Sequence, residues 1–500
     1  MSANPPRVDI PQPNFFDRAI SYLWPKAGLE RMRARAVMAL AGGYTGARKD
    51  KAQLSRWNPG GGSPDSDLIP DLPALRQRSR DLARNEAVAT GAIGTTVSHV
   101  VGTGLSCNPQ AVASLVGLSK EQAAAWNADV KLRFNAWASS KDCDLSRQMT
   151  FYGLQSLAFR TTVESGDAFV LTPMVTREIG GPTLALQVIE GDLVCNPRGM
   201  SDSATLTEGI EHDPTTGEPK IVHVANRHPG DLRREPITWR PVPVRGASGR
   251  KAVIHLFRPT RAGQRRGAPL LAPIIEPLKQ LGRYTDAELN AAVTSGLFAV
   301  FMKMDPQAFQ DLFSEDDQND FVQRSMKWSG EIESGKAINL LPGEEPITSN
   351  PGRPNAQFDP FVQSILVQIG MALGIPFEVL TQRFQSSYTA AKGALLQAWR
   401  FFLGWRDWLS TNLCQEVYLI WLSHEVAAGR IRAPGFFVSP LLRHAWSSCM
   451  WVGDGPGSID PTKEVEAAEK RIALGISTGE AESILHDGVD WETKHARLVE

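Results

Sequence analysis

The strongest pattern of hydrophobic and polar positions in this chain lies between Gln385 and Gly429. Apolar residues recur there every three or four positions, which keeps one face of an α-helix apolar along its whole length. They are Ala391, Leu395, Trp399, Phe402, Trp405, Leu409, Leu413, Val417 and Ile420. Ser386 or Ser387 can cap the start, and Gly429 can form the left-handed turn that ends the helix. We therefore predict one long helix, the rod, which is packed on several sides and in part by other subunits.

The same spacing predicts shorter helices over residues 73–92, 120–138, 273–297 and 358–373, and in the tail from Asp460. Asp71 is a possible cap for the first of them. In the helix over 273–297 we expect the following residues to point inward: Ile274, Leu278, Leu281, Tyr284, Leu289 and Val293. The helices over 273–297 and 358–373 flank a small non-helical insert, and the rod follows directly.

Between residues 167 and 257 the pattern changes to short alternating runs that are typical of β-strands. Residues 213–217 fit a hairpin connection between two of these runs. Four histidines fall on different predicted strands without metal-ligand spacing, so we expect them to be surface or packed residues: His212, His223, His228 and His255. Together with the helices, these runs predict an α+β protein of several domains.

Composition changes this picture only slightly, because 42% hydrophobic and 21% charged residues are typical of a globular chain. The net charge of −1 argues against a protein that grips nucleic acid over its whole surface, although not against one that guides DNA. The five cysteines have no CxxC spacing, so neither a zinc site nor a disulfide framework is indicated, and a reducing compartment is expected. The uncharged stretch 360–377 contains glycine, proline and glutamine, and we expect a buried helix there rather than a membrane span.

The densest basic cluster consists of Arg258, Arg261, Arg265 and Arg266. For Arg261, Arg265 and Arg266 we favour a subunit interface, because arginine pairs bidentately with carboxylates; a channel lining is the alternative for the cluster. A second run of arginines on the helix over 73–92 is expected to be solvated or salt-bridged: Arg76, Arg78, Arg80 and Arg84.

One stretch, Gly330–Ala337, nearly matches the phosphate-binding loop GxxxxGK[ST]. Its last position needs a hydroxyl to hold Mg²⁺, and Ala337 has none. The residues after it read as a strand and a turn, whereas a phosphate loop must open a helix. We therefore expect a hairpin of the insert, with no cofactor and no catalytic residues, and keep an ATP-binding packaging motor or a nuclease as the alternative.

Four blocks in the same order resemble the portal proteins of tailed bacteriophages, lambda type. They are LRQRSRDLARNEAVATGAI with VVGTGL (75–105), AVIHLFRPTRAGQRRGAPLLAPIIEPLKQLGRYTDAELNAA (252–292), IGMALGIPFEVLTQRFQSSYTAAKGALLQAW (369–399) and IDPTKEVEAAEKRIALGIST (459–478). The resemblance implies a ring, usually of twelve copies, at one capsid vertex of the virion. Double-stranded DNA passes through such a ring during packaging and ejection, and the particle is assembled in the host cytoplasm.

The resemblance also implies a layout. Residues 1–265 would form an N-terminal arm and a β-rich wing, and residues 266–297 and 355–373 the helical stem. Residues 298–354 would form a small mixed clip, residues 374–387 the tunnel-loop region, and residues 388–500 the long channel-to-wing helix, the rest of the wing and a helical crown. The implied partners are other copies of the chain, terminase large subunit, major capsid protein and head-completion or adaptor proteins, with no membrane.

In the tunnel-loop region the residues expected beside DNA are Gln382, Arg383, Gln385 and Ser386. Arg383 is the best candidate for a transient phosphate contact, and a salt bridge to a neighbouring subunit is its alternative. A third hypothesis for the whole chain is an adaptor or scaffold without a channel, which the near-neutral charge also permits.

Overall fold

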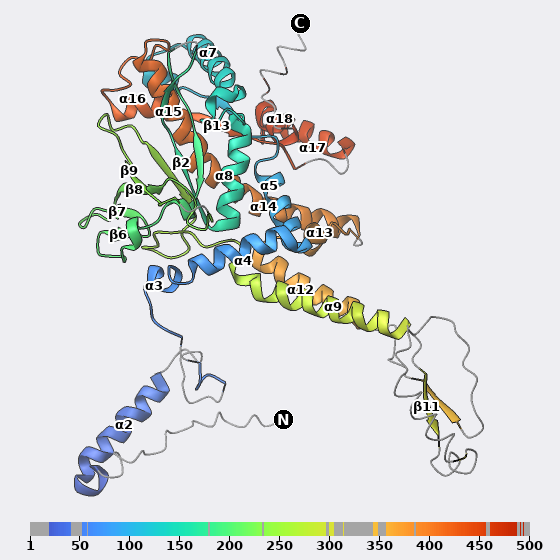
Figure 1. Cartoon of the computed structure of the whole chain (residues 1–500). Coiled ribbons are helices and arrows are strands. Elements are labelled where there is room, and N and C mark those ends of the chain that lie inside the picture. The colour runs from blue at the N-terminus through green and yellow to red at the C-terminus, as the bar shows by residue number, and fades with distance from the viewer. Residues whose placement is uncertain are drawn as a thin grey trace. The chain divides into compact units, whose positions relative to one another are not determined.

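The computed structural model describes residues 20–41, 53–57, 59–178, 181–232, 235–296, 300–304, 314, 344–348, 357–384, 387–456, 461–487, 491 and 494 (Figure 1). They fall into two compact units, Met1–Ser63 and Pro64–Glu500. The first unit contains helix α2 (Pro25–Ala41). All the elements below belong to the second unit.

The main hydrophobic core is built by helices from both halves of the chain. They are α4 (Leu72–Asn85), α5 (Ala87–Val100), α7 (Lys120–Ser139), α8 (Phe151–Ser165), α14 (Tyr388–Leu409) and α15 (Gln415–Ala427). Phe134 lies at the centre, with its ring 5.1–6.0 Å from the rings of Trp421, Tyr418, Phe151 and Trp451. The predicted helix over 120–138 is therefore confirmed, and its apolar stripe faces this core.

The predicted helix over 73–92 is two helices, because the chain is extended at Glu86 (φ −119°, ψ 119°) between α4 and α5. The Glu86 carboxylate accepts a hydrogen bond from the Ala89 amide and so caps α5. Asp71 occupies the cap position of α4 without a side-chain cap hydrogen bond. No proline or glycine marks the break, which is why the periodicity alone did not predict it.

The β-rich segment forms small antiparallel sheets. A three-stranded sheet has the order β10 (Val253–Phe257), β2 (Asp167–Leu171), β5 (Gln187–Glu190), and a four-stranded sheet the order β6 (Leu206–Thr207), β7 (Ile210–His212), β8 (Pro219–Ala225), β9 (Trp239–Pro243). The predicted hairpin over 213–217 is confirmed, since it joins β7 to β8. Strand β2 is buried on both faces: Ala168 and Val170 pack in the main core, and Phe169 and Leu171 in a second, smaller core. The predicted α+β class is confirmed.

Three further strand pairs complete the described sheets. They are β1 (Ser106–Pro109) with β13 (Cys449–Val452), β3 (Met174–Thr176) with β4 (Pro182–Leu184), and β11 (Val300–Met304) with β12 (Glu344–Thr348). The short helices are α3 (Pro64–Leu68), α6 (Ala113–Val116), α13 (Phe377–Thr381) and α16 (Pro440–Trp446). The tail forms α17 (Pro461–Ala473) and α18 (Gly479–Asp487), and the helices α9 (Ile275–Gly296) and α12 (Phe358–Leu373) lie on either side of the insert in the sequence. Within the described ranges, no helix has the length and apolar character needed to span a bilayer.

The rod consists of α14 and α15 joined by a π-helical turn over Ser410–Cys414. Ser387 caps it, and Gly429 has the predicted left-handed conformation (φ +71°). Its own subunit covers most of its apolar face, from Phe402 to Trp421. The expectation that the rod is packed on several sides is confirmed for α15, which packs in the main core. The contribution expected from other subunits stays a prediction, and the first half of the rod has exposed apolar residues for it, such as Leu396.

Candidate functional site

Helices α9 and α12 lie side by side and form the first part of the candidate site (Figure 1). Tyr284 of α9 joins them, because its ring is 5.6 Å from Phe358 and 4.9 Å from Phe361 of α12. Near the main core the pair is buried through residues such as Leu278 and Ile369. Large apolar residues are exposed both farther along the pair and on the outer side of α12 near the core.

The exposed apolar residues of this pair are Leu289, Val293, Phe361, Val367 and Met371. Leu289 and Val293 are 63% and 58% exposed, so the expectation that they point inward is wrong for the single subunit. The helical periodicity marked Leu289 and Val293 as apolar positions, but no described element of the chain covers them. We call these five residues the exposed stem face.

The turn that follows α12 depends on two glycines. Gly374 is left-handed (φ +70°), and the Ile375 amide donates back to the Gly370 carbonyl at 2.9 Å, which ends the helix. A Cβ on Gly370 would lie 2.5 Å from the Ile375 carbonyl oxygen, and one on Gly374 would lie 2.6 Å from the Phe401 ring. The chain therefore reverses sharply from α12 into α13 and then towards α14.

The sequence-predicted DNA-proximal residues lie between α13 and α14. Gln382 is exposed and left-handed (φ +54°), and Arg383 is exposed beside it. The Arg383 guanidinium lies 3.9 Å from the Asp359 carboxylate of α12, an exposed pair that contributes little stability. Gln385 and Ser386 lie outside the described residues. The structure thus brings Gln382 and Arg383 together on one exposed turn, and gives Arg383 an acidic neighbour within its own subunit.

The four arginines of the basic cluster have different surroundings. Arg258 places its guanidinium 4.6 Å from the centre of the Trp405 ring. Arg261 pairs with Asp67, and Arg265 donates to Thr207 Oγ1 at 2.6 Å. Each of these contacts attaches the segment before α9 to another part of the same subunit.

Arg266 lies inside the subunit and offers no surface to a neighbouring copy. Its Nε donates to Asp167 Oδ2 at 2.6 Å, and its two other nitrogens donate to the carbonyls of Val194, Glu208 and Gly191. The interface role expected for the cluster therefore does not extend to Arg266, because its binding capacity is used within the chain.

A second guanidinium completes this buried cluster, since Arg76 of α4 donates to Asp167 Oδ1 at 2.7 Å. Burial alone would raise the pKa of the Asp167 carboxyl, but the charges of Arg266 and Arg76 hold that pKa well below its usual range. The His255 Nε2–H donates to the same carboxylate at 3.3 Å, and the His255 ring stacks on Phe169. The cluster joins α4, β2, β10 and the segment before α9, which fixes the base of α9 on the sheet.

One group of described side chains has the composition of a metal site: Glu190, Asp192 and His228 offer ligand atoms within 4.8 Å of one another. The Gly230 amide donates to His228 Nδ1 at 3.0 Å, so the proton of the neutral imidazole is on Nε2, which faces the carboxylates. A protonated nitrogen has no lone pair for a cation, and the Arg80 guanidinium already pairs with Asp192 at 2.5 Å. The group is an ion-pair network.

Comparisons with known proteins identify the family of this chain. Residues 50–406 match the family described as phage portal protein, lambda family. The chain belongs to the lambda family of phage portal proteins. It is a phage portal protein and head-tail connector, a structural component of the capsid and not an enzyme. This assignment supports the portal interpretation over the nucleotide-binding alternative, whose motif at 330–337 lies outside the described residues.

Two portal proteins are similar in sequence to this chain over most of its length. The chain is 26% identical to portal protein B of Escherichia phage lambda and 25% identical to the portal protein of Escherichia phage N15. Each match spans 477 residues, which is 92% of this chain and 89% of the relative. Among solved structures, the neck of a native gene transfer agent particle computed with C12 symmetry matches with a TM-score of 0.46 and 11% identity, over 83% of this chain and 92% of that one.

Sequence reasoning missed Asp167 and Arg76 as members of one cluster, and it missed the exposed stem face. Asp167 lies 91 residues from Arg76 and 99 from Arg266, so no local spacing connects the three. A charged residue at the start of an otherwise apolar strand was the one available signal. For the exposed stem face, the helical period marked Leu289 and Val293 but neither Val367 nor Met371, and it did not tell which positions the same chain covers.

Proposed function

We propose that copies of this portal protein form a ring of twelve at one capsid vertex, and that double-stranded DNA passes through it during packaging and ejection. In this proposal, residues 266–297 and 355–373 are the stem, 298–354 the clip and 374–387 the tunnel-loop region. Residues 1–265 are the arm and wing, and residues 388–500 complete the wing and form the crown. The clip docks terminase large subunit and later the head-completion or adaptor proteins, the wing contacts major capsid protein, and assembly takes place in the host cytoplasm.

The observation that carries the proposal is the exposed stem face. Met371 is 77% exposed and Leu289 63% exposed, on helices that are otherwise well packed against each other. Removing apolar surface from water stabilises an assembly by about 25 cal/mol per Å². In a ring, the same face of every copy meets a different face of the next copy, so each stem pair is covered by its neighbour.

The charge distribution agrees with a conduit. A subunit with a net charge of −1 attracts DNA phosphates only weakly as a whole, and each tight phosphate contact would add salt-dependent grip that opposes sliding. The described part of the turn after α13 has one cation, Arg383, between polar and apolar neighbours. This suits brief contact with a moving polyanion.

Particle mass and electron microscopy of the purified full chain test the proposal. We expect rings, and we expect Met371→Asp to weaken them, because a carboxylate would be buried at the stem contact. Leu232→Asp is the matched control, since Leu232 is 97% exposed on a loop after β8, away from the stem helices. A parent chain that stays monomeric in every condition would overturn the proposed ring. A Met371→Asp chain that forms rings as readily as the control would overturn the stem contact on which the proposal rests.

A further inference from the structure

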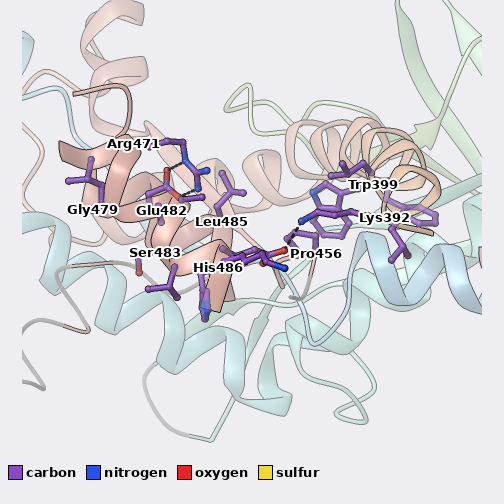
Figure 2. A pocket seen from close by; sticks show the side chains of 18 of the residues that line it. Lys392, Trp399, Pro456, Arg471, Gly479, Glu482, Ser483, Leu485 and His486 are labelled. Atoms are coloured by element: carbon purple, nitrogen blue, oxygen red, sulfur yellow. Dashed lines mark hydrogen bonds and ion pairs between the residues drawn. The ribbon is translucent and has the colours of Figure 1, made fainter. Parts of the chain in front are cut away.

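An open apolar groove lies between the first half of the rod and the two tail helices (Figure 2). Its volume is about 560 Å³. Leu396 and Trp399 of α14 line one side, and Ile472 of α17 and Leu485 of α18 line the other. We call it the tail groove. Its size is that of a site that encloses a small ligand, which is ample for two aliphatic side chains.

The walls of the tail groove are held in place by ion pairs. Lys392 of α14 lies 3.3 Å from the Glu464 carboxylate of α17. Arg471 of α17 donates to both carboxylate oxygens of Glu482 of α18, at 2.8 Å and 2.6 Å (Figure 2). These pairs connect α14 to α17 and α17 to α18, so the groove is a formed feature and its apolar residues stay open between the ion pairs. Leu396 and Leu485 are among its exposed residues.

The connection between α17 and α18 exposes two large aliphatic side chains. Leu474 and Ile476 are 74% and 72% exposed, and neither lines the tail groove. Their backbone is fixed, because the amides of Gly475 and Ile476 donate to the carbonyls of Ile472 and Arg471 at 3.0 Å and 2.9 Å. Gly475 has the left-handed conformation (φ +69°) that this turn requires. We call Leu474 and Ile476 the apolar turn.

We propose that the tail groove of one copy receives the apolar turn of the neighbouring copy. The proposal rests on the ring of the proposed function and deepens it by naming a contact. Rotation about a ring axis keeps every residue at its own height and radius, so a groove and the surface that fills it must lie at the same level of one chain. Ile472 near the end of α17 lines the tail groove, and Leu474 of the apolar turn follows it by two residues, so the two features are neighbours in the chain, as this condition requires. Insertion removes both exposed apolar surfaces from water at once.

Cysteine cross-linking in the full chain tests the contact directly. The double variant Leu396→Cys with Ile476→Cys should give a ladder of dimer, trimer and higher bands under mild oxidation of assembled particles. Each single variant controls for the native cysteines, of which Cys449 and Cys195 are only half-buried. A double variant with no more ladder than the single variants would overturn the proposal, even where the parent forms rings.

A second variant pair measures the contribution of the apolar turn to assembly. Ile476→Asp should raise the concentration at which half of the chain is assembled by about tenfold or more, because it puts a charge into an apolar contact. Val438→Asp is the matched control, because Val438 is 88% exposed on a loop that does not line the tail groove. Both variants change exposed residues, so their thermal unfolding should match that of the parent.

The outcomes separate the two proposals. Rings from the Ile476→Asp chain at the control concentration would refute the contact and leave the portal ring intact. A parent chain that forms no rings would remove the proposed ring and this contact together. If a separate apolar ligand or another protein fills the tail groove, the double cysteine variant will show no ladder, which also refutes the contact.

Discussion

The carboxylate of Asp167 shows how much of this fold depends on single residues. It is completely buried and pairs with two buried guanidinium groups, from Arg76 and Arg266. Breaking a buried ion pair by removing one charge is costly, because the remaining charge stays buried without its partner. The two arginines come from α4 and from the segment before α9, so loss of the Asp167 charge would destabilise both.

We therefore predict that Asp167→Asn destabilises the subunit by about 3–5 kcal/mol. Asp129→Asn is the control, because Asp129 forms an exposed pair with Arg133 on α7 and its loss should cost less than about 1 kcal/mol. Thermal unfolding of the two variants beside the parent measures the difference. Equal melting temperatures for the two variants would contradict a structural role for the buried cluster.

Two glycines beside this cluster also require their small size. A Cβ on Gly267 would lie 1.9 Å from the Gly166 carbonyl oxygen, so the two backbone segments could not approach each other as they do. We predict that Gly267→Ala lowers the melting temperature strongly, whereas Gly282→Ala raises it slightly, because Gly282 lies in α9 with open space around it. A Gly267→Ala chain as stable as the parent would show that the segment before α9 can move away.

The candidate site illustrates what could be predicted from residues alone. The exposure of Gln382 and Arg383 on one turn agrees with the loop that the family resemblance implied for this region. The burial of Arg266 could not be predicted, because its partner Asp167 is far away in the sequence and a neighbouring arginine, Arg261, is exposed. The dense cluster suggested one common role, whereas each arginine contacts a different element.

At the scale of elements, the strong helical periods predicted most of what the structure contains. The bounds of α12 match the prediction, and the rod ends at Gly429 as expected. The periods did not predict α8, whose sequence mixes apolar residues with glycine, serine and threonine. They also failed to separate apolar positions that the subunit covers from those it leaves open, because that depends on the tertiary packing of distant elements.

The rod provides a direct test of which apolar residues its own subunit covers. Trp405 is buried against Phe159 and beneath Arg258, whereas Leu403, two positions earlier, is 43% exposed. We predict that Trp405→Ala costs about 3–5 kcal/mol of subunit stability, and that Leu403→Ala costs much less. Chemical unfolding of disassembled chains measures both. Similar losses for the two variants would mean that the rod is not covered as described.

The α17–α18 hairpin should respond to acid through the Arg471–Glu482 pair. The hydrogen bonds from Arg471 lower the pKa of Glu482 to about 2. A lowered carboxyl pKa stabilises the folded state at neutral pH, and that stabilisation declines as the pH falls from the ordinary carboxyl value towards about 2. The pair is part-buried and joins only α17 to α18, so the effect is local.

We therefore predict that Arg471→Gln accelerates amide exchange in α18 at pH 6, compared with the parent at the same pH. At pH 3 the difference should shrink, because Glu482 approaches the protonation range in which the pair no longer contributes. Exchange measured by mass spectrometry on α18 peptides gives both values, and α7 peptides serve as the internal reference. A difference that is as large at pH 3 as at pH 6 would contradict the assigned pair.

At the scale of the whole molecule, the family assignment and the uncovered apolar surfaces both favour assembly from subunits that fold separately. The main core is complete within one chain, so a subunit can fold before it assembles. The surfaces left open are the exposed stem face, the tail groove and the apolar turn. They lie on α9, α12, the first half of the rod and the tail segment, and these are the contacts that we propose for the ring.

The role of Arg383 is a property of the assembled particle. We predict that Arg383→Glu leaves ring assembly intact but lowers the amount of DNA that particles package or retain, since the charge reversal repels phosphates at the exposed turn. Arg240→Glu on β9 is the matched control, with the same charge change on an exposed strand. Packaged DNA per particle is the measurement. Equal DNA contents in the two variants would remove Arg383 from the DNA path.

The attachment of α9 has a mechanical consequence. Just before the helix, the Leu270 amide donates to the Val163 carbonyl of α8, Gln264 bonds the Arg266 carbonyl, and the Arg266 side chain is fixed on β2. Tension along α9 therefore reaches the Leu270–Val163 hydrogen bond first and the buried Arg266 next, so two successive attachments resist it. Because the segment before α9 is anchored in this way, a pull at the far end of the helix is transmitted to α8 and to the sheet.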